Sequence, residues 1–93
     1  MKKLRDTLSE QRRLDILRLL AVSGETGEGL IAAAIEAPQD LVRTELAWLA
    51  DNGLVAITET GGVRFAAPTR RGSEAAAGVA IVPGVAGFQR RKR

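Results

Sequence analysis

The side chains that most often perform nucleophilic, acid–base or metal chemistry are scarce in this sequence. It contains no Cys, no His and no Tyr. Their lack excludes disulfides, thiolate nucleophiles, zinc-finger ligation and imidazole general bases. The carboxylates, Lys, Ser and Thr that remain form no spacing that we can connect to a reaction, and Gly61-Gly62 has none of the surroundings of a phosphate-binding loop. The sequence therefore predicts a protein that is not an enzyme and has no metal or cofactor site.

Arginine and lysine are the remaining candidates for chemistry, because they bind the phosphates and base edges of nucleic acids. The net charge is +3, but the positive charge gathers at the ends, at Lys2, Lys3 and Arg5 and again at 90–93. Residues 6–89 carry seven Arg against eleven acids, a balance of −4. This distribution argues against a strongly electropositive globular face and predicts that a basic C-terminal tail supplies phosphate contacts.

The elements that must position these residues begin with two helices. Thr7-Leu8-Ser9-Glu10 has the form of a capping box, which predicts a helix from Leu8 to Val22. Thr26 is the expected N-cap of a second, apolar helix that Pro38 brings to an end. The apolar residues of the first helix recur at helical spacing and predict one buried side, made of Leu14, Ile16, Leu17, Leu20 and Ala21.

A third helix is predicted from Pro38 to Asn52, with Val42, Leu46 and Leu49 at i, i+4 and i+7 facing the core. Two short strands and a closing helix follow. The ranges 54–58 and 63–67 read as a hairpin around the glycine-containing turn 59–62. The closing helix is expected to start after Thr69 as its cap and to run to about residue 80.

The hydrophobic core must be assembled from few large side chains. The chain is 45% hydrophobic but only 3% aromatic. We expect Leu, Ile, Val and Ala to form this core, with Trp48 and Phe65 as its two large members. With 93 residues the chain is long enough for one compact domain. We assign 1–7 to a basic arm, 8–81 to the domain and 82–93 to a flexible basic tail.

The order helix, helix, helix, hairpin, helix is that of a winged helix-turn-helix, mostly α with a small β-hairpin. The stretch from Val42 to Val55 resembles the recognition helix and first wing strand of bacterial regulators of the ArsR, MarR and DeoR kinds, in which V-R-x-x-L-x-x-L-x-x-x-G-L-V patterns are common. Thr69-Arg70-Arg71-Gly72 resembles the T-x-x-G that closes the wing in many MarR-type proteins.

The chain resembles most specifically the small winged-helix proteins of Mu-like bacteriophages and prophages. This resemblance is carried by the helical stretch 8–20, by the recognition-helix segment and by Val82-Pro83-Gly84-Val85. The connection at Glu36-Ala37-Pro38 is shorter than the usual helix-turn-helix link of that family. The resemblance implies a DNA-binding fold, in either a regulatory or a DNA-packaging role.

The predicted partner is double-stranded DNA, with the third helix in a major groove and the wing on the flanking backbone. Arg43 is the preferred base or phosphate contact, although it could instead pair with Asp40 and Glu45 along its own helix. The acids of this helix outnumber its one Arg, which favours an alternative, a protein-interaction module that holds a second copy or a phage protein partner. The candidate DNA-binding residues are Gln39, Arg43, Thr44, Arg64, Arg70, Arg71, Arg90, Arg91, Lys92 and Arg93.

The sequence also bears on cellular location. No apolar run approaches the roughly 20 residues that a membrane span requires, so no membrane partner is expected. Lys2-Lys3 is not followed by the apolar segment of a secretory signal. We therefore expect a cytoplasmic protein of a bacterial host.

Overall fold

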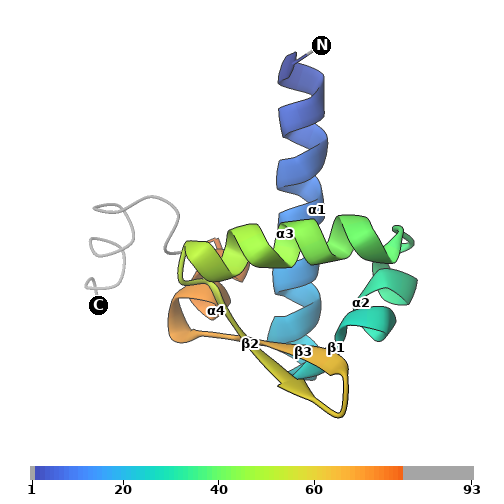
Figure 1. Ribbon diagram of the computed structural model, residues 1–93. Helices are drawn as coiled ribbons and strands as arrows, with labels where there is room; N and C mark the ends of the chain where they lie inside the picture. The colour runs from blue at the N-terminus through green and yellow to red at the C-terminus, as the bar shows by residue number, and fades with distance from the viewer. Residues whose placement is uncertain (1, 79–93) are drawn as a thin grey trace, which may run out of the picture.

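The computed structural model describes residues 2–78 of the chain, and the predicted C-terminal tail lies outside this range. Four helices and three short strands follow one another along the chain (Figure 1). In chain order they are α1 (Lys2–Ser23), β1 (Thr26–Gly27), α2 (Glu28–Ile35), α3 (Gln39–Asp51), β2 (Val55–Thr60), β3 (Val63–Pro68) and α4 (Arg70–Ala76).

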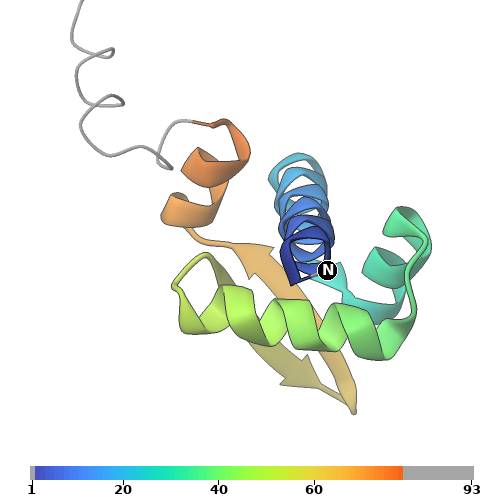
Figure 2. The same cartoon turned by 90° about the horizontal axis from the view of Figure 1, so that it is seen from above.

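The strands form one antiparallel sheet in the order β1-β3-β2. Ala66, near the middle of β3, lies opposite Thr26 on one side and Ile57 on the other, and it is fully buried. Viewed along α1, this helix lies between α2 and α4, and α3 runs beside it over the hairpin (Figure 2). The predicted winged helix-turn-helix is confirmed, with one strand more than the sequence indicated.

The extra strand corrects the predicted start of the second helix. Thr26 is not an N-cap: it lies in β1, and its hydroxyl donates to the Gly24 carbonyl oxygen at 2.9 Å. The N-cap of α2 is Gly27, which provides no side-chain hydrogen bond. Pairing with β3 satisfies backbone groups of β1 that a helix start at Thr26 would have left free.

The predicted ends of the first and last helices are also wrong. No Gly or Pro interrupts residues 2–23, so α1 begins at Lys2, Thr7 lies inside it, and the expected arm continues the helix. Its N-terminal part projects past α3 (Figure 1). Ala21, expected to be buried, is exposed. At the other end α4 stops at Ala76, followed by Gly78 with φ +78°.

The core is entirely aliphatic, so the prediction that Trp48 and Phe65 belong to it is wrong. Trp48 is 41% exposed at the edge of α3, with the Arg13 guanidinium 3.9 Å from its ring centroid. Phe65 is half-buried, because it alternates with Ala66 and faces the other side of the sheet. The buried apolar residues are Ile16, Leu17, Leu20, Ile31, Ala32, Val42, Leu46, Leu49, Val55, Ala66 and Ala75.

The junction between wing and α4 explains the Thr69-to-Gly72 motif. The Thr69 hydroxyl accepts a hydrogen bond from the Gly72 backbone N–H at 3.0 Å, which confirms the predicted cap, and donates to the Gly53 carbonyl oxygen at 2.7 Å. A Cβ on Gly72 would collide with the Leu54 carbonyl oxygen. One threonine and one glycine thus join the end of α3, the start of the wing and α4.

The wing turns more tightly than predicted. Glu59 and Thr60 belong to β2, and only Gly61 and Gly62 form the turn, with φ of +57° and +78°. Two successive residues with positive φ match the right-handed twist of a two-residue hairpin, which glycine adopts without strain. The longer β2 carries Glu59 to a position opposite Arg64 on β3.

Candidate nucleic-acid interface

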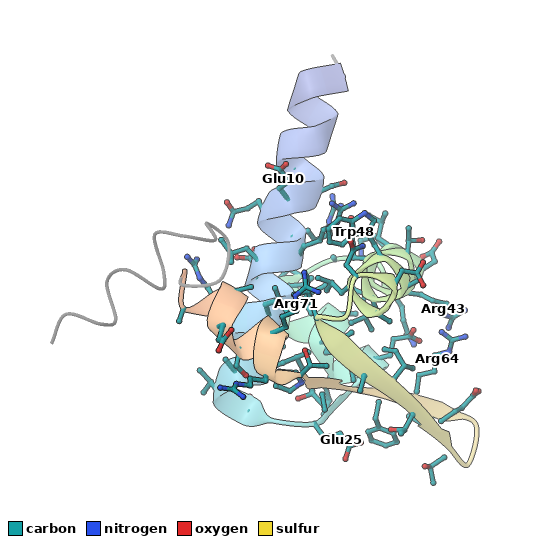
Figure 3. The ribbon with its side chains drawn as sticks, turned by 90° about the vertical axis from the view of Figure 1, so that its left-hand side faces the viewer. Glu10, Glu25, Arg43, Trp48, Arg64 and Arg71 are labelled. Carbon is teal, nitrogen blue, oxygen red and sulfur yellow. The ribbon has the colours of Figure 1, made fainter. Side chains whose placement is uncertain are left out.

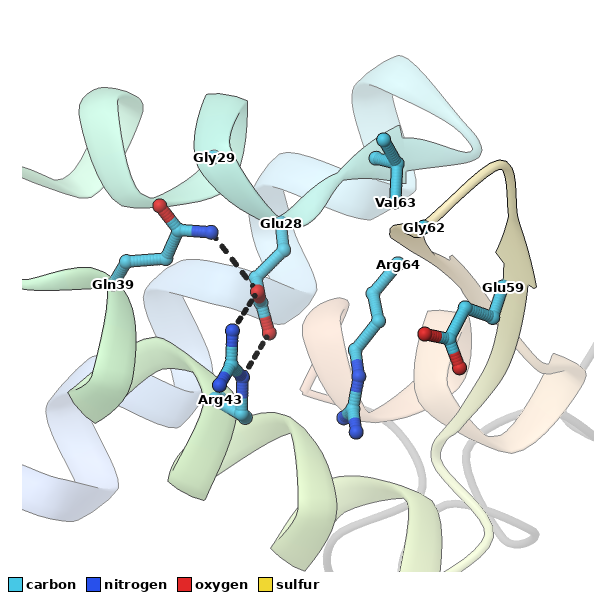
Figure 4. A pocket seen from close by; sticks show the side chains of 8 residues that line it. All are labelled: Glu28, Gly29, Gln39, Arg43, Glu59, Gly62, Val63 and Arg64. Atoms are coloured by element: carbon cyan, nitrogen blue, oxygen red, sulfur yellow. Dashed lines mark hydrogen bonds and ion pairs between the residues drawn. The ribbon is translucent and has the colours of Figure 1, made fainter.

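The centre of the candidate interface is a buried carboxylate at the first residue of α2. Glu28 is 3% exposed, and its position at a helix N-terminus suits a negative charge. Arg43 of α3 donates from Nε to Oε2 at 3.1 Å and from Nη2 to Oε1 at 3.0 Å. Gln39 donates from Nε2 to Oε1 at 3.0 Å (Figure 4). Three side chains from two helices therefore form one hydrogen-bonded unit, which we call the Glu28 cluster.

The wing faces this cluster. Val55, Ile57 and Glu59 alternate along one face of β2, and Arg64 shares that face with buried Ala66 across the hairpin. Arg64 therefore points toward α2 and α3 and not outward from the wing. The residues enclose a hollow of about 310 Å³ (Figure 4), lined by Glu28, Gly29, Gln39, Arg43, Glu59, Gly62, Val63 and Arg64.

The electrostatics of the hollow keep Glu28 ionised. Hydrogen bonding from Arg43 lowers the pKa of Glu28 below its usual value and outweighs the burial that acts in the opposite direction. The Gln39 hydrogen bond and the nearby charge of Arg64 lower this pKa further. Two carboxylates and two guanidinium groups line the hollow, so its formal charge balances.

The lowered pKa predicts how stability depends on pH. A carboxyl group whose pKa is lower in the folded than in the unfolded state stabilises the fold above its unfolded pKa, which is about 4.3 for Glu. That contribution is lost as the pH falls through the folded pKa. We expect wild type to be more stable than Glu28→Gln near neutral pH, with a difference that shrinks in acid. Urea unfolding of both proteins across this pH range measures it, and a constant difference would contradict the assignment.

The solvent-facing side of α3 is less acidic than its sequence indicates. Glu45 is 3% exposed and turned toward α1, where Arg12 donates to it at 2.8 Å and Arg13 at 2.7 Å. Arg43 pairs with Glu28 rather than with Asp40 or Glu45, since burial holds the Glu28 carboxylate within reach of its fork. Glu45, one of the acids whose charge would oppose a DNA contact, therefore does not lie on the solvent-facing side of α3.

Thr44 lies next to Arg43 on the exposed side of α3. Its hydroxyl donates to the Asp40 carbonyl oxygen at 3.1 Å, one turn earlier on the helix. Asp40 and Asp51 are also exposed, so the outermost surface of α3 carries carboxylates beside the hydroxyl of Thr44. The cationic group of this helix, Arg43, lies on its side toward α2 and the wing.

The remaining sequence-predicted residues lie elsewhere. Arg70 and Arg71 belong to α4, which follows the wing. Figure 3 shows Arg71 away from Arg43 and Arg64. The Arg70 side chain is 92% exposed and pairs with Glu74 at 3.6 Å, and Arg71 lies against Gly53. Arg90, Arg91, Lys92 and Arg93 lie outside the described residues.

Two acidic residues of the hollow were missed by sequence reasoning. Glu28 contacts partners 11 and 15 residues further along the chain, so no helical or strand period connects them. Its position between Gly27 and Gly29 gives no signal of burial. Glu59 was assigned to the turn, whereas the longer strand places it opposite Arg64.

A metal site and a membrane-spanning helix are two further features that would bear on function. Within residues 2–78, no group of three or more acidic side chains is placed to hold a metal ion. No helix in the same range combines the length and apolar character needed to cross a bilayer.

Comparisons with known proteins bear on the fold and on the family of the chain. No family model matches the sequence. The chain is 36% identical over 86 residues to the uncharacterized protein gp26 of Escherichia phage Mu, covering 86% of this chain and 90% of the phage protein. HlyU from Vibrio cholerae has a TM-score of 0.65 at 25% identity over 80% of each chain. An apo double mutant of ZitR from Lactococcus lactis has a TM-score of 0.66 at 18% identity, covering 82% of this chain and 59% of that one.

Proposed function

The chain belongs to the family of gp26 of phage Mu, a family of phage winged-helix proteins, and from this premise we propose that it is a DNA-binding regulator of a Mu-like phage or prophage. It acts without enzymatic chemistry in the cytoplasm of the bacterial host. Its kinship with ArsR- and MarR-like regulators, suggested by the segment 42–55, is part of this proposal. DNA packaging is the alternative task for the same binding activity.

The observation that carries the proposal is the convergence of Arg43 and Arg64 in one hollow between α3 and the wing. In winged-helix docking, residues near the N-terminus of the third helix meet base edges while the wing meets the backbone. Arg43 is the fifth residue of α3 and lies on the wing side of that helix. Withdrawal of Glu45 into pairs with Arg12 and Arg13 removes a carboxylate that would repel phosphate.

A salt titration distinguishes two modes of contact. Removing Gln89 to Arg93 should weaken binding to all duplexes alike and reduce the slope of log affinity against log salt by about 0.9 for each phosphate that the tail no longer neutralises. Arg43→Ala should instead cost about 1–3 kcal/mol, mainly on the preferred site. The measurement is a mobility shift with phage DNA and random duplex at low and moderate salt. Wild-type protein that binds neither duplex at low salt would contradict the proposal.

A protein-interaction role is the second candidate, and exposed apolar side chains favour it. Val22 is 87% exposed, Leu30 68% and Leu8 53%. Val22 borders a shallow hollow between α1 and α2, and Leu8 borders a second one beside the α2–α3 connection. A second copy or a phage protein would cover such surfaces. Sedimentation of the purified protein over a concentration series measures self-association directly.

A further inference from the structure

We infer that Glu28 is a positioning residue that presents one chosen edge of Arg43 to a guanine base. This inference rests on the proposed DNA binding and adds the base that is read and the residue that directs the reader. Glu28 is too deeply buried to meet DNA, so its role is exerted through Arg43.

The hydrogen bonds divide the guanidinium into an occupied and a free edge. Nε and Nη2 of Arg43 both donate to Glu28, which occupies the side of the fork. Nη1 is the third nitrogen of the group. It makes no hydrogen bond to any described residue and carries no dashed line in Figure 4. The side chain is still 53% exposed. The end of the fork, formed by Nη1 and the second hydrogen of Nη2, remains available to a ligand.

A pair of parallel N–H donors matches a pair of neighbouring acceptors. Guanine offers O6 and N7 in the major groove, and a bidentate arginine is the commonest specific contact to them. Gln39 donates one of its two amide hydrogens to the same Glu28 carboxylate, which ties its side chain to this support. The arrangement thus favours guanine among the four bases.

The charge balance of the hollow favours a base over a phosphate. A phosphate contact gains most of its free energy from excess positive charge and the release of counterions. Here the charge of Arg43 is opposed by Glu28 at 3.0 Å, and the carboxylate of Glu59 lines the same hollow as Arg64. A neutralised guanidinium loses long-range attraction but keeps the direction of its hydrogen bonds. That combination gives little sequence-independent affinity and retains discrimination.

Restraint of Arg43 before binding also lowers the cost of recognition. Arginine loses considerable rotamer entropy when a contact immobilises it. The Glu28 carboxylate is itself held by burial and by Gln39, so the fork is oriented by a rigid support rather than by a mobile one. The ordering cost is met when the chain folds, and the contact with guanine then requires little further ordering.

The test starts from a random-sequence duplex pool, from which wild-type protein selects its preferred site. Affinities are then measured for that site, for random duplex, and for the site with each guanine in turn replaced by 7-deazaguanine, which lacks the N7 acceptor. We expect Glu28→Gln to reduce the ratio of the affinity for the selected site to the affinity for random duplex. The reduction should be at most the roughly 5- to 150-fold preference that one bidentate contact supplies. We expect the same variant to become insensitive to one 7-deazaguanine that weakens wild type.

Glu59→Gln is the matched control, because it removes the same charge from the same hollow without touching a hydrogen bond of Arg43. Both variants should bind random duplex more tightly than wild type, but only Glu28→Gln should lose preference. Arg43→Lys, at an exposed position, keeps the charge without the fork and should lose preference as well. The double variant Glu28→Gln with Arg43→Lys should lose no more preference than Arg43→Lys alone, since Glu28 and Arg43 act as a unit.

The outcomes separate the inference from the proposed function. Wild-type protein that binds no duplex defeats both. Wild-type protein that selects a site, with Glu28→Gln keeping its preference, overturns the inference alone. The inference is also overturned if Arg43→Lys loses the same affinity for every sequence, because Arg43 would then contact a phosphate. If melting shows Glu28→Gln to be unfolded, Arg43→Lys decides, and an unchanged preference in that variant overturns the inference.

Discussion

Leu49→Ala is expected to remove a large part of the stability of the fold. Leu49 is fully buried on α3, and truncation of such a residue costs about 2–5 kcal/mol, because the cavity left behind collapses only in part. A domain of this size keeps about 5–10 kcal/mol of net stability, at the low end of the general range. Leu46→Ala, at 2% exposure, should behave alike. Urea and thermal unfolding followed by circular dichroism measure the loss.

Leu41→Ala on the same helix is the control for that experiment. Leu41 is 38% exposed, so its truncation removes less packed surface and leaves no enclosed cavity. We expect a shift well below that of Leu49→Ala. A melting temperature of Leu49→Ala within a degree or two of wild type would mean that the buried face of α3 is assigned wrongly.

Gly72→Ala is the second change with a large expected effect, although alanine is the better helix former. The added Cβ would overlap the Leu54 carbonyl oxygen, which already accepts from the Thr69 backbone N–H. Forcing atoms into a packed site costs roughly 1–3 kcal/mol. If α4 shifts to relieve the overlap, the Thr69 cap is lost as well, at about 1 kcal/mol.

Ser73→Ala tests whether that loss comes from the overlap or from α4 in general. Ser73 is the next residue of the helix and is exposed, so the same substitution product is introduced without a collision. We expect its free energy of unfolding to equal or slightly exceed that of wild type, because alanine favours helix. Equal melting temperatures for Gly72→Ala and wild type would contradict the close approach of Gly72 to Leu54.

Local sequence signals predicted those parts of the fold that depend on neighbours along the chain. The spacing of Val42, Leu46 and Leu49 identified the buried face of α3, and Thr69 identified the start of α4. The capping box at Thr7 predicted the start of the first helix wrongly, because helix-favouring residues precede it without a break. Strand β1 is only two residues long and is stabilised by pairing with β3, which no local pattern around Thr26 could indicate.

The candidate site was predictable only as a set of exposed cations. Arg43 and Arg64 were identified by their places on the third helix and the wing, but their meeting depends on the way the hairpin folds back toward α2. The acids that organise them come from distant segments. Glu28 and Glu45 are both 3% exposed, although charged residues are rarely so buried without partners. Glu28 is paired with Arg43, and Glu45 with Arg12 and Arg13, in each case across two helices. A single sequence does not reveal such pairs.

The surface position of Trp48 determines what the ultraviolet emission of this protein reports. The chain has one Trp and no Tyr, so a single indole dominates its intrinsic fluorescence. That indole is stacked under Arg13, which Glu45 in turn anchors between α1 and α3. Emission therefore follows the contact between these two helices rather than the packing of the aliphatic interior, and loosening of the interior with this contact intact leaves the signal unchanged.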